Sequence, residues 1–369
     1  MSKNTNQATV TTEDSTLGQV LYMAFELGDN NWKIAFSDGR PQHRVVTLPS
    51  RDLKRLSEEI TKAKCRFKLS NDCEVVSCYE AGRDGFWLHR FLVKNDVQNV
   101  VVDSASIEVN RRRRRAKTDR LDARKLLFML IRHHGGEPRV WSVVYIPSEE
   151  DEDARQLHRD LEQLKKEAQQ HRNRITSLLI AQGVTLCVRK NFLQELRSVR
   201  LWNGKKLSTL LLERLKREYR RLRMVNEQVQ SLQAQRKKLL KTSSCSRVAK
   251  VRDLQCLRGL GMEGSWLLIM EMFGWRQFYN RKEVGASAGL TGTPYDSGGS
   301  AHDQGISKAG NRRVRWMMCE LSWCWLRFQP ESALSQWFNE RFGEGKRHRR
   351  KGIVALARRL LIAIWRYIE

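Results

Sequence analysis

A long charge-rich stretch in the middle of the chain, residues 148–241, constrains the fold more than any other feature. Its two halves, residues 148–183 and 207–241, place apolar residues three and four positions apart and contain few helix breakers. Residues at that spacing share one face of an α-helix. We therefore expect two long helices that pair as an antiparallel hairpin or coiled coil, a helical arm at residues 146–245. Such an arm is typical of a spacer or an oligomerisation element, so we expect the chemistry elsewhere.

The sequence before the arm alternates between strand and helix patterns. Apolar strand patterns occupy residues 20–27, 32–39, 73–82 and 97–104, and helical patterns occupy residues 50–67, 83–95 and 119–134. Ser50 is a candidate cap for the first of these helices. The alternation predicts an α/β domain at residues 18–145. The polar residues 1–17 before it are predicted to be a disordered tail.

The sequence after the arm, residues 246–369, predicts a mainly helical carboxy-terminal domain. Gly259 and Gly261 mark a tight turn between two helices, and two interpretations of this turn stand side by side. Its free backbone N–H groups offer a phosphate site, or the glycines only serve the turn of a helical hairpin. Further on, a Gly/Ser-rich loop leads into a basic, tryptophan-rich helix, and a last helix ends the chain.

The charge balance identifies the class of partner. The chain has 68 Lys and Arg against 41 Asp and Glu, which leaves a formal net charge of +27 and a pI near 10.2. Such an excess favours a polyanion, because Lys and Arg that neutralise phosphates release condensed counterions. No apolar run approaches the roughly 20 residues of a membrane span, and Arg358 and Arg359 interrupt the best one. We therefore expect nucleic acid, and no membrane, as the partner.

The beginning of the sequence and its cysteines point to the cytoplasm. The first residues are polar and lack the apolar core of a signal peptide. The eight cysteines are scattered, and none forms the C-x-x-C pair of a zinc site or a compact disulfide framework. We expect reduced thiols in a cytoplasmic protein.

Four carboxylates stand out by their placement. Glu26 and Glu80 fall at the ends of predicted strands, and Asp119 and Asp122 lie three residues apart on one helix face, just after five consecutive arginines. Hard oxygen ligands in such an arrangement suit one or two Mg²⁺ ions in a phosphoryl-transfer site. Taken singly, each acid is more often a solvated charge or a member of a helix ion pair. Together, in an α/β context beside an arginine run, they favour the metal site.

Four segments carry a family resemblance. "FELGDNNWKIAF", "CYEAGRDGFWLHRFL", "AKTDRLDARKLL" and "AGLTGTPYDSGGSAHDQGISKAGNRRVRW" resemble, in order and spacing, the DEDD transposases of bacterial insertion sequences, which are recombinases guided by a bridge or seeker RNA. The resemblance covers nearly the whole chain from about residue 20. It implies a RuvC-like amino-terminal domain of RNase H type, with Glu26, Glu80, Asp119 and Asp122 as its Mg²⁺-binding acidic tetrad. The family's first acid is usually Asp, and here it is Glu26.

The resemblance also implies a nucleophile in the carboxy-terminal domain. The family carries a serine upstream of "ISKAGN", and the matching residue is Ser297, with Ser300 and Ser307 as nearby competitors. A serine hydroxyl needs a base or a metal to activate it, and metal-bound carboxylates are candidates.

Two basic segments are the candidate nucleic-acid contacts. Around Trp316, which suits base stacking, we expect phosphate contacts from a set of polar and basic residues: Lys308, Asn311, Arg312, Arg313 and Arg315. The arginine run is predicted to clamp a DNA or guide-RNA backbone through Arg111, Arg112, Arg113, Arg114 and Arg115.

The leading hypothesis is an RNA-guided DNA transposase that acts as a dimer or tetramer on the ends of its element and on target DNA. It cuts and rejoins strands through a covalent bond between Ser297 and DNA. One alternative is a RuvC-like metal nuclease that resolves branched DNA without a serine intermediate. Another is a non-catalytic nucleic-acid-binding scaffold, in which the four acids are surface charges.

Overall fold

The structure, a computed structural model of the chain, describes residues 20–107, 119–297 and 300–369. For residues 119, 295–297, 300–304, 346 and 347 it describes the backbone alone. The tail predicted at residues 1–17 and the arginine run lie outside the described residues. The chain divides into two compact units, Met1–Ile146 and Pro147–Glu369.

The amino-terminal unit contains a five-stranded mixed sheet, which confirms the predicted α/β class. The strands lie in the order β3-β2-β1-β4-β5, with β1 antiparallel to β2, β2 antiparallel to β3, and β1, β4 and β5 mutually parallel. Their bounds are Val20–Leu27 (β1), Asn31–Ser37 (β2), Arg44–Pro49 (β3), Glu74–Glu80 (β4) and Val97–Val102 (β5). Strand β3 was absent from the sequence prediction, since its half-buried edge position leaves no clean apolar alternation.

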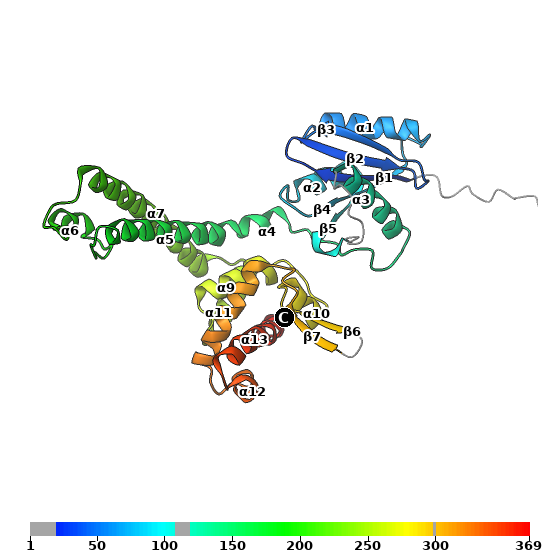
Figure 1. The fold of residues 1–369 in the computed structure, drawn as a ribbon. Helices are drawn as coiled ribbons and strands as arrows, with labels where there is room; N and C mark the ends of the chain where they lie inside the picture. Colours follow the sequence, from blue (N-terminus) through cyan, green and yellow to red (C-terminus); the bar gives the residue numbers. More distant parts are fainter. Residues whose placement is uncertain (1–19, 108–118, 298–299) are drawn as a thin grey trace, which may run out of the picture. The chain divides into compact units, whose positions relative to one another are not determined.

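Helices cover both faces of this sheet (Figure 1). On one face, Leu56 of α1 and Leu88 of α2 share a buried cluster with Phe25 and Tyr79. On the other face, Leu127 of α3 shares a cluster with Ala24. The helices are α1 (Leu53–Arg66), α2 (Trp87–Lys94), the short 3-10 helix η1 (Ser104–Ser106) and α3 (Asp119–His134). The cap of α1 is Asp52, which accepts a hydrogen bond from the Arg55 N–H, and not Ser50.

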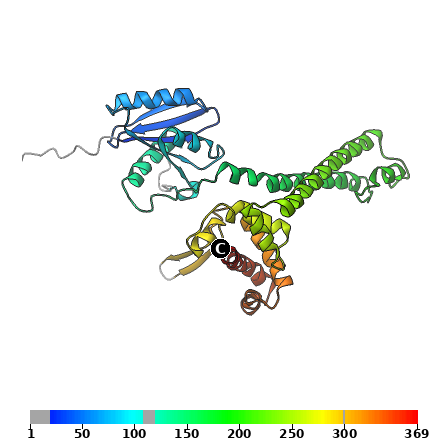
Figure 2. The ribbon, with the colours of Figure 1, turned by 180° about the vertical axis from the view of Figure 1, so that it is seen from behind.

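The carboxy-terminal unit begins with the helical arm. A capping box on Ser148 starts the first helix, and α5 and α7 then lie side by side as a long hairpin with α6 near its far end (Figures 1 and 2). The helices are α4 (Glu149–Ala154), α5 (Gln156–Ile180), α6 (Phe192–Ser198) and α7 (Thr209–Thr242). Leucines, Phe192 and Tyr219 fill the interior of the hairpin. The buried Glu218 of α7 ties the pair together, because it contacts His171 of α5 at 2.7 Å.

The remainder of this unit is mainly helical, with one β-hairpin. A single apolar cluster joins α8, α9, α11 and α13. The elements are α8 (Ser246–Gln255), α9 (Met262–Leu268), the π-helical turn η2 (Ile269–Phe273), α10 (Arg281–Ser287), β6 (Gly292–Ser297), β7 (Ser300–Ile306), α11 (Arg312–Phe328), α12 (Ala333–Phe342) and α13 (Lys346–Ile368). The segment predicted as a Gly/Ser loop is thus the β6-β7 hairpin.

The turn between α8 and α9 serves a helical hairpin. Gly259 has φ +96°, a conformation that favours glycine, and it lies so close to α11 that an added Cβ would sit 3.5 Å from the Cys324 carbonyl oxygen. Gln329 donates a hydrogen bond to the Arg258 carbonyl at 2.9 Å. The positive φ of this turn explains the glycine without a ligand, since the contact with α11 is an ordinary van der Waals distance.

Among the helices of the described ranges, none combines the length and the apolar character that crossing a membrane requires.

Candidate active site

Glu26 and Glu80 lie at the same edge of the sheet. Glu26 is the penultimate residue of β1 and Glu80 is the last residue of β4. The two strands run parallel and pair in a register that sets Phe25 opposite Tyr79. The next residue on each strand is the glutamate. Because adjacent parallel strands present their carboxyl ends at one edge, the two carboxylates come from neighbouring positions at the centre of the sheet.

The two glutamates also point to the same face. Side chains alternate along a strand, and Ala24 of β1 and Cys78 of β4 belong to the cluster under α3. Glu26 and Glu80 are each two residues further on and therefore share that face. Glu26 is half-buried and Glu80 is exposed, as expected at the rim of a sheet.

Helix α3 brings its amino-terminal turn toward this edge. Near its carboxyl end, His134 contacts the Tyr22 hydroxyl at 2.9 Å, and in its middle the Leu126 carbonyl accepts a hydrogen bond from Cys78 Sγ at 3.8 Å. The helix thus runs against the direction of β1 and β4. Asp122 lies one turn before Leu126, about 6 Å along the axis, and the two-residue step from Cys78 to Glu80 is about 7 Å. Asp122 and the first residue of α3, Asp119, are therefore carried toward the glutamates.

The donors at this edge suit a divalent ion, because carboxylate oxygens are the ligands that Mg²⁺ prefers. Among the side chains that the structure describes, no three His, Cys, Asp or Glu lie close enough together to hold a metal, and Asp119 is not one of those side chains. The metal tetrad stays a prediction. Lys33 of β2 pairs in register with Glu26 and brings a positive charge to the same face.

Asp29, the other acid near the end of β1, has a different environment. It lies in the turn between β1 and β2, where it forms an ion pair with Arg83. Its carboxylate is 74% exposed. Of the two acids, Glu26 alone is on the strand and on the face that α3 covers.

Ser297 is the last residue of β6, and its register partner on β7 is Ser300. The two serines close the described pairs of this hairpin at the end next to its turn. Ser307 is at the other end, where its backbone N–H donates to the Thr291 carbonyl at 2.8 Å. Seven residue steps, about 23 Å of extended strand, separate Ser300 from Ser307. Of the candidate nucleophiles, Ser297 and Ser300 share one location and Ser307 does not.

The basic residues predicted around Trp316 have distinct environments. Lys308 lies in the loop after β7 with φ +57°, and Arg312 is exposed at the start of α11. Arg313 donates to Glu162 of the arm at 2.8 Å, and Arg315 donates to the Ala288 carbonyl at 2.9 Å. Asn311 caps α11 by accepting from the N–H groups of Arg313 and Val314.

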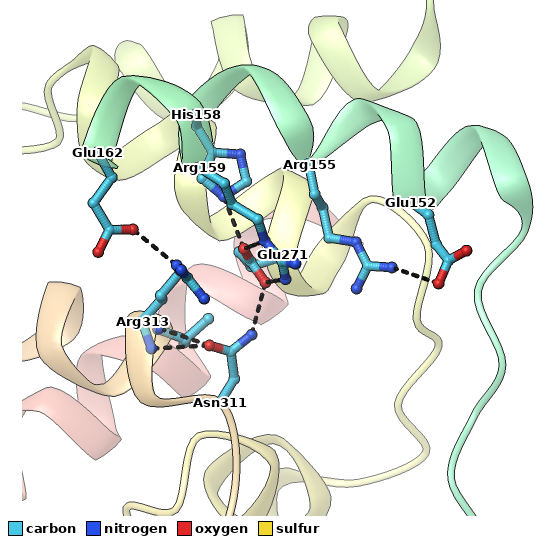
Figure 3. A network of polar contacts seen from close by, with 9 residues as sticks. Glu152, Arg155, His158, Arg159, Glu162, Glu271, Asn311 and Arg313 are labelled. Atoms are coloured by element: carbon cyan, nitrogen blue, oxygen red, sulfur yellow. Dashed lines mark hydrogen bonds and ion pairs between the residues drawn. The ribbon is translucent and has the colours of Figure 1, made fainter. Parts of the chain in front are cut away.

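Sequence reasoning missed a buried network around Glu271 (Figure 3). This carboxylate, in the π-helical turn η2, is fully buried and accepts hydrogen bonds from His158 Nε2 at 2.8 Å and from two guanidinium nitrogens of Arg159 at 2.7 and 2.9 Å. Asn311 donates to it at 2.9 Å through Nδ2. The base of the arm and the first turn of α11 are thus joined through one side chain.

The Glu271 carboxylate is held in its charged form. Burial alone would raise the pKa of Glu271, but the hydrogen bonds from His158, Arg159 and Asn311 outweigh it and hold the pKa well below its ordinary value. The glutamate lies in the apolar run "LLIMEMF", more than 100 positions from its partners in α5. An acid inside an apolar run was the one signal that pointed to it.

Comparisons with known proteins agree on one class. Residues 251–336, which include the β6-β7 hairpin, Glu271 and Asn311, match the family described as Transposase IS116/IS110/IS902 family. A putative transposase, y4rJ, of Sinorhizobium fredii is 37% identical over 366 residues, which cover 95% of this chain and 92% of that protein. A second putative transposase of the same organism, y4qE, is 26% identical and covers 69% of this chain and 60% of its own length. The transposase for insertion sequence element IS1533 of Leptospira borgpetersenii is 24% identical, with 64% and 66% covered.

The chain is thus a DNA-recombining enzyme of the transposase class, similar over nearly its full length to a putative transposase. It belongs to the IS116/IS110/IS902 family of transposases. The predicted insertion-sequence transposase is confirmed, and DNA is its partner.

Proposed function

We propose that the protein transposes DNA through a covalent serine intermediate assisted by a metal-bound acidic tetrad, with an RNA that pairs with donor and target DNA. One observation carries the chemical part. Glu26 and Glu80 lie at the carboxyl ends of adjacent parallel strands, on the face covered by α3, and the first turn of that helix contains Asp119 and Asp122. A RuvC-like domain of RNase H type accounts for this order of strands and this placement of acids.

The proposed reaction retains the energy of the phosphodiester bond, because each ester bond to phosphorus that breaks is replaced by a new one. The Ser297 hydroxyl oxygen attacks the phosphorus of a DNA phosphodiester, the new bond joins serine to phosphate, and the bond to the leaving sugar oxygen breaks. The serine proton passes to a base, and the leaving oxygen takes up a proton. Rejoining is the reverse step with the hydroxyl of a different strand, so no nucleotide cofactor is consumed. Glu26, Glu80, Asp119 and Asp122 would hold Mg²⁺, which would supply charge stabilisation to the phosphoryl transfer.

The hairpin geometry supports Ser297 or its partner Ser300 as the nucleophile. Both belong to the last described pair of β6 and β7, at the end of the hairpin farthest from Ser307. A nicked suicide substrate that loses its leaving strand traps the covalent species. We expect a protein–DNA adduct with the wild-type protein and with Ser300→Ala, and none with Ser297→Ala. Absence of an adduct from the wild-type protein contradicts the serine mechanism.

The same observation favours a second candidate function, a RuvC-like metal nuclease that resolves branched DNA. All four acids belong to the amino-terminal unit, and water attack needs no serine. The two functions differ in product. The nuclease releases free DNA ends from branched substrates and forms no adduct, and Ser297→Ala leaves its rate unchanged.

The RNA guide rests on the family resemblance and on the net charge of +27. The test is to co-express the protein with its complete element, purify it and sequence the bound RNA. We expect one discrete RNA from the flank of the element. A random sample of cellular RNA contradicts the guided mechanism. We also propose that the protein acts as a dimer or tetramer. Light scattering of the RNA-bound protein measures the number of subunits.

A further inference from the structure

The carboxy-terminal unit has a groove of about 1040 Å³ between α13 and the base of the β6-β7 hairpin. Gly292, Gly305 and Ile306 line it on the hairpin side. Its basic side chains are Arg281, Lys308, Lys351, Arg358, Arg359 and Arg366. Among the residues whose side chains the structure describes, no Asp or Glu lines the groove, so its described lining is strongly positive.

One face of α13 forms the long wall, and its composition alternates from turn to turn. The residues that line the groove recur at helical spacing from Lys351 to Arg366. A turn with Lys351 is followed by one with Val354 and Ala355, next by one with Arg358 and Arg359, and next by one with Ile362 and Ala363. Arg366 completes the series. Successive basic turns are about 11 Å apart along the helix axis, with an apolar turn between them.

The six basic groups are not neutralised within the part of the chain that the structure describes. None of them forms an ion pair with a described carboxylate. Lys351, Arg359 and Arg366 are exposed to solvent. Such a surface is complementary to a polyanion, because phosphates neutralise positive charges for which the described part of the protein provides no carboxylate.

The groove also offers stacking surfaces. The Arg359 guanidinium lies 3.9 Å from the centre of the Trp337 ring, so the two side chains form a cation–π stack in the wall of the groove. Leu290, Ile306 and Ile362 line the groove as well. In a duplex the faces of the bases are stacked on each other and hidden. An apolar surface between basic turns can contact the faces of bases only when the nucleic acid is unpaired there.

We propose that this groove binds a segment of single-stranded DNA, with phosphates on the basic turns of α13 and unpaired bases against the apolar turns. The role rests on the proposed function, since cutting and rejoining strands leaves a segment unpaired near the β6-β7 hairpin. The base of that hairpin is part of the groove. The groove thus holds the strand that leads to Ser297.

The test is equilibrium binding of the full-length protein, by fluorescence anisotropy, to a single-stranded DNA of about 12 nucleotides and to the same sequence as a duplex. Lys351→Glu and Arg366→Glu reverse charges at the two ends of the groove. Arg350→Glu is the matched control, because Arg350 is exposed on the same helix but does not line the groove. We expect each groove variant to weaken single-strand binding about tenfold, and the control to change it less than about twofold.

A second variant tests the apolar turns without changing charge. Ala363 is exposed in the groove, and Ala363→Phe fills the space that a base would take. We expect about tenfold weaker binding of the single strand and unchanged binding of the duplex. An equal loss for both forms shows that the groove contacts only backbone, and overturns the proposal.

Two further outcomes overturn the proposal. If the groove variants weaken binding of an RNA of the same sequence and leave DNA unaffected, the strand is RNA. If Arg366→Glu changes the oligomeric state and not the affinity for DNA, the groove is a protein interface. The adduct test on Ser297 is independent of these measurements. If the wild-type protein forms no adduct but the groove variants weaken single-strand binding as expected, only the serine mechanism is refuted. If the wild-type protein forms the adduct but the groove variants bind normally, only the groove proposal is refuted.

Discussion

The Asn311 side-chain amide donates a 2.9 Å hydrogen bond to the buried Glu271 carboxylate, and its carbonyl oxygen caps α11. Asn311 therefore links the start of α11 to the turn η2. His158 and Arg159 contact the same carboxylate. The base of the arm is therefore fixed to the loop that follows the β6-β7 hairpin. We infer that this contact positions the hairpin relative to the arm.

Glu271→Gln tests the strength of this link. The substitution leaves Arg159 without its carboxylate and His158 with a weaker partner, so we expect a loss of about 2 to 3 kcal/mol in the free energy of unfolding. The estimate allows for the partial solvation of Arg159, whose side chain is 36% exposed. Urea unfolding followed by tryptophan fluorescence measures it. Glu162→Gln, which removes the exposed pair with Arg313, is the control and costs at most about 1 kcal/mol. Equal losses from the two variants contradict a special role for Glu271.

Acid sensitivity follows from the direction of two pKa shifts. Burial alone would raise the pKa of Glu263, but hydrogen bonds from Arg236 and Lys165 lower it from 4.5 to about 2, and the pKa of Glu271 is also lowered. A carboxyl whose folded pKa is depressed contributes stability above its unfolded pKa and loses it as the pH falls through the folded value. We therefore expect the stability of the carboxy-terminal unit to decline between about pH 4.5 and about pH 2.

Urea unfolding at about pH 5 and about pH 3 measures this decline. Glu271→Gln and Glu263→Gln each remove one titrating group, so each should reduce the difference between the two pH values. The Glu263 effect is the smaller of the two, because its side chain is 50% exposed and solvent screens its ion pairs. If both variants lose as much unfolding free energy between these two pH values as the wild-type protein does, other carboxyls cause the acid sensitivity.

The strands and long helices were predictable, because local periodicity determines them. Residues 20–27 and 97–104 show apolar strand patterns, and the arm shows helical spacing throughout. Glu26 and Glu80 were recognisable as strand-end acids for the same reason, although their common face required the register of β1 on β4. Strand β3 and the β6-β7 hairpin were missed, since an edge strand and a Gly/Ser-rich ribbon carry weak alternation.

Long-range contacts between polar residues were not predictable. Nothing in the neighbourhood of His158 distinguishes it from the other charged residues of the arm, and its partner Glu271 is 113 positions away. The sequence predicted a phosphate contact for Asn311, which stays a prediction, but it gave no sign that the side chain caps α11 and bonds to Glu271. Such roles depend on which elements pack together, and a single sequence does not specify that packing.

Gly310 offers a test of the loop between the hairpin and α11. It has φ +133°, and an added Cβ would lie 2.5 Å from the Ser287 carbonyl oxygen and 2.6 Å from the Gly289 nitrogen. Because both neighbours are backbone atoms, Gly310→Ala forces the loop to move, and we expect a loss of more than about 2 kcal/mol. Gly183→Ala is the matched control, with φ +71° and open space around the added carbon, at about 1 kcal/mol. Thermal unfolding of both variants measures the difference, and equal effects would show that the loop accommodates a side chain.

The acidic edge of the sheet gives the sharpest functional prediction. Glu80→Gln and Asp122→Asn remove one charge each from the edge where β1 and β4 end under α3, and neither residue lies in the apolar core. If these carboxylates bind the metal of strand transfer, each variant should lower the rate of transposition of a donor plasmid at least about 100-fold. The far-ultraviolet circular dichroism spectrum should match that of the wild type, because neither charge lies in the apolar core. The affinity for DNA should stay within about twofold, because one charge contributes little to it.

Glu74→Gln is the matched control for this prediction. Glu74 begins β4 at the opposite edge of the same sheet, where it accepts a 2.6 Å hydrogen bond from Gln98. The control makes the same change of charge on the same strand, about 20 Å from Glu80. We expect it to transpose at the wild-type rate. Retained transposition in Glu80→Gln and Asp122→Asn would mean that the acids are surface charges, and an equal loss in Glu74→Gln would mean that the sheet, and not the metal site, is at fault.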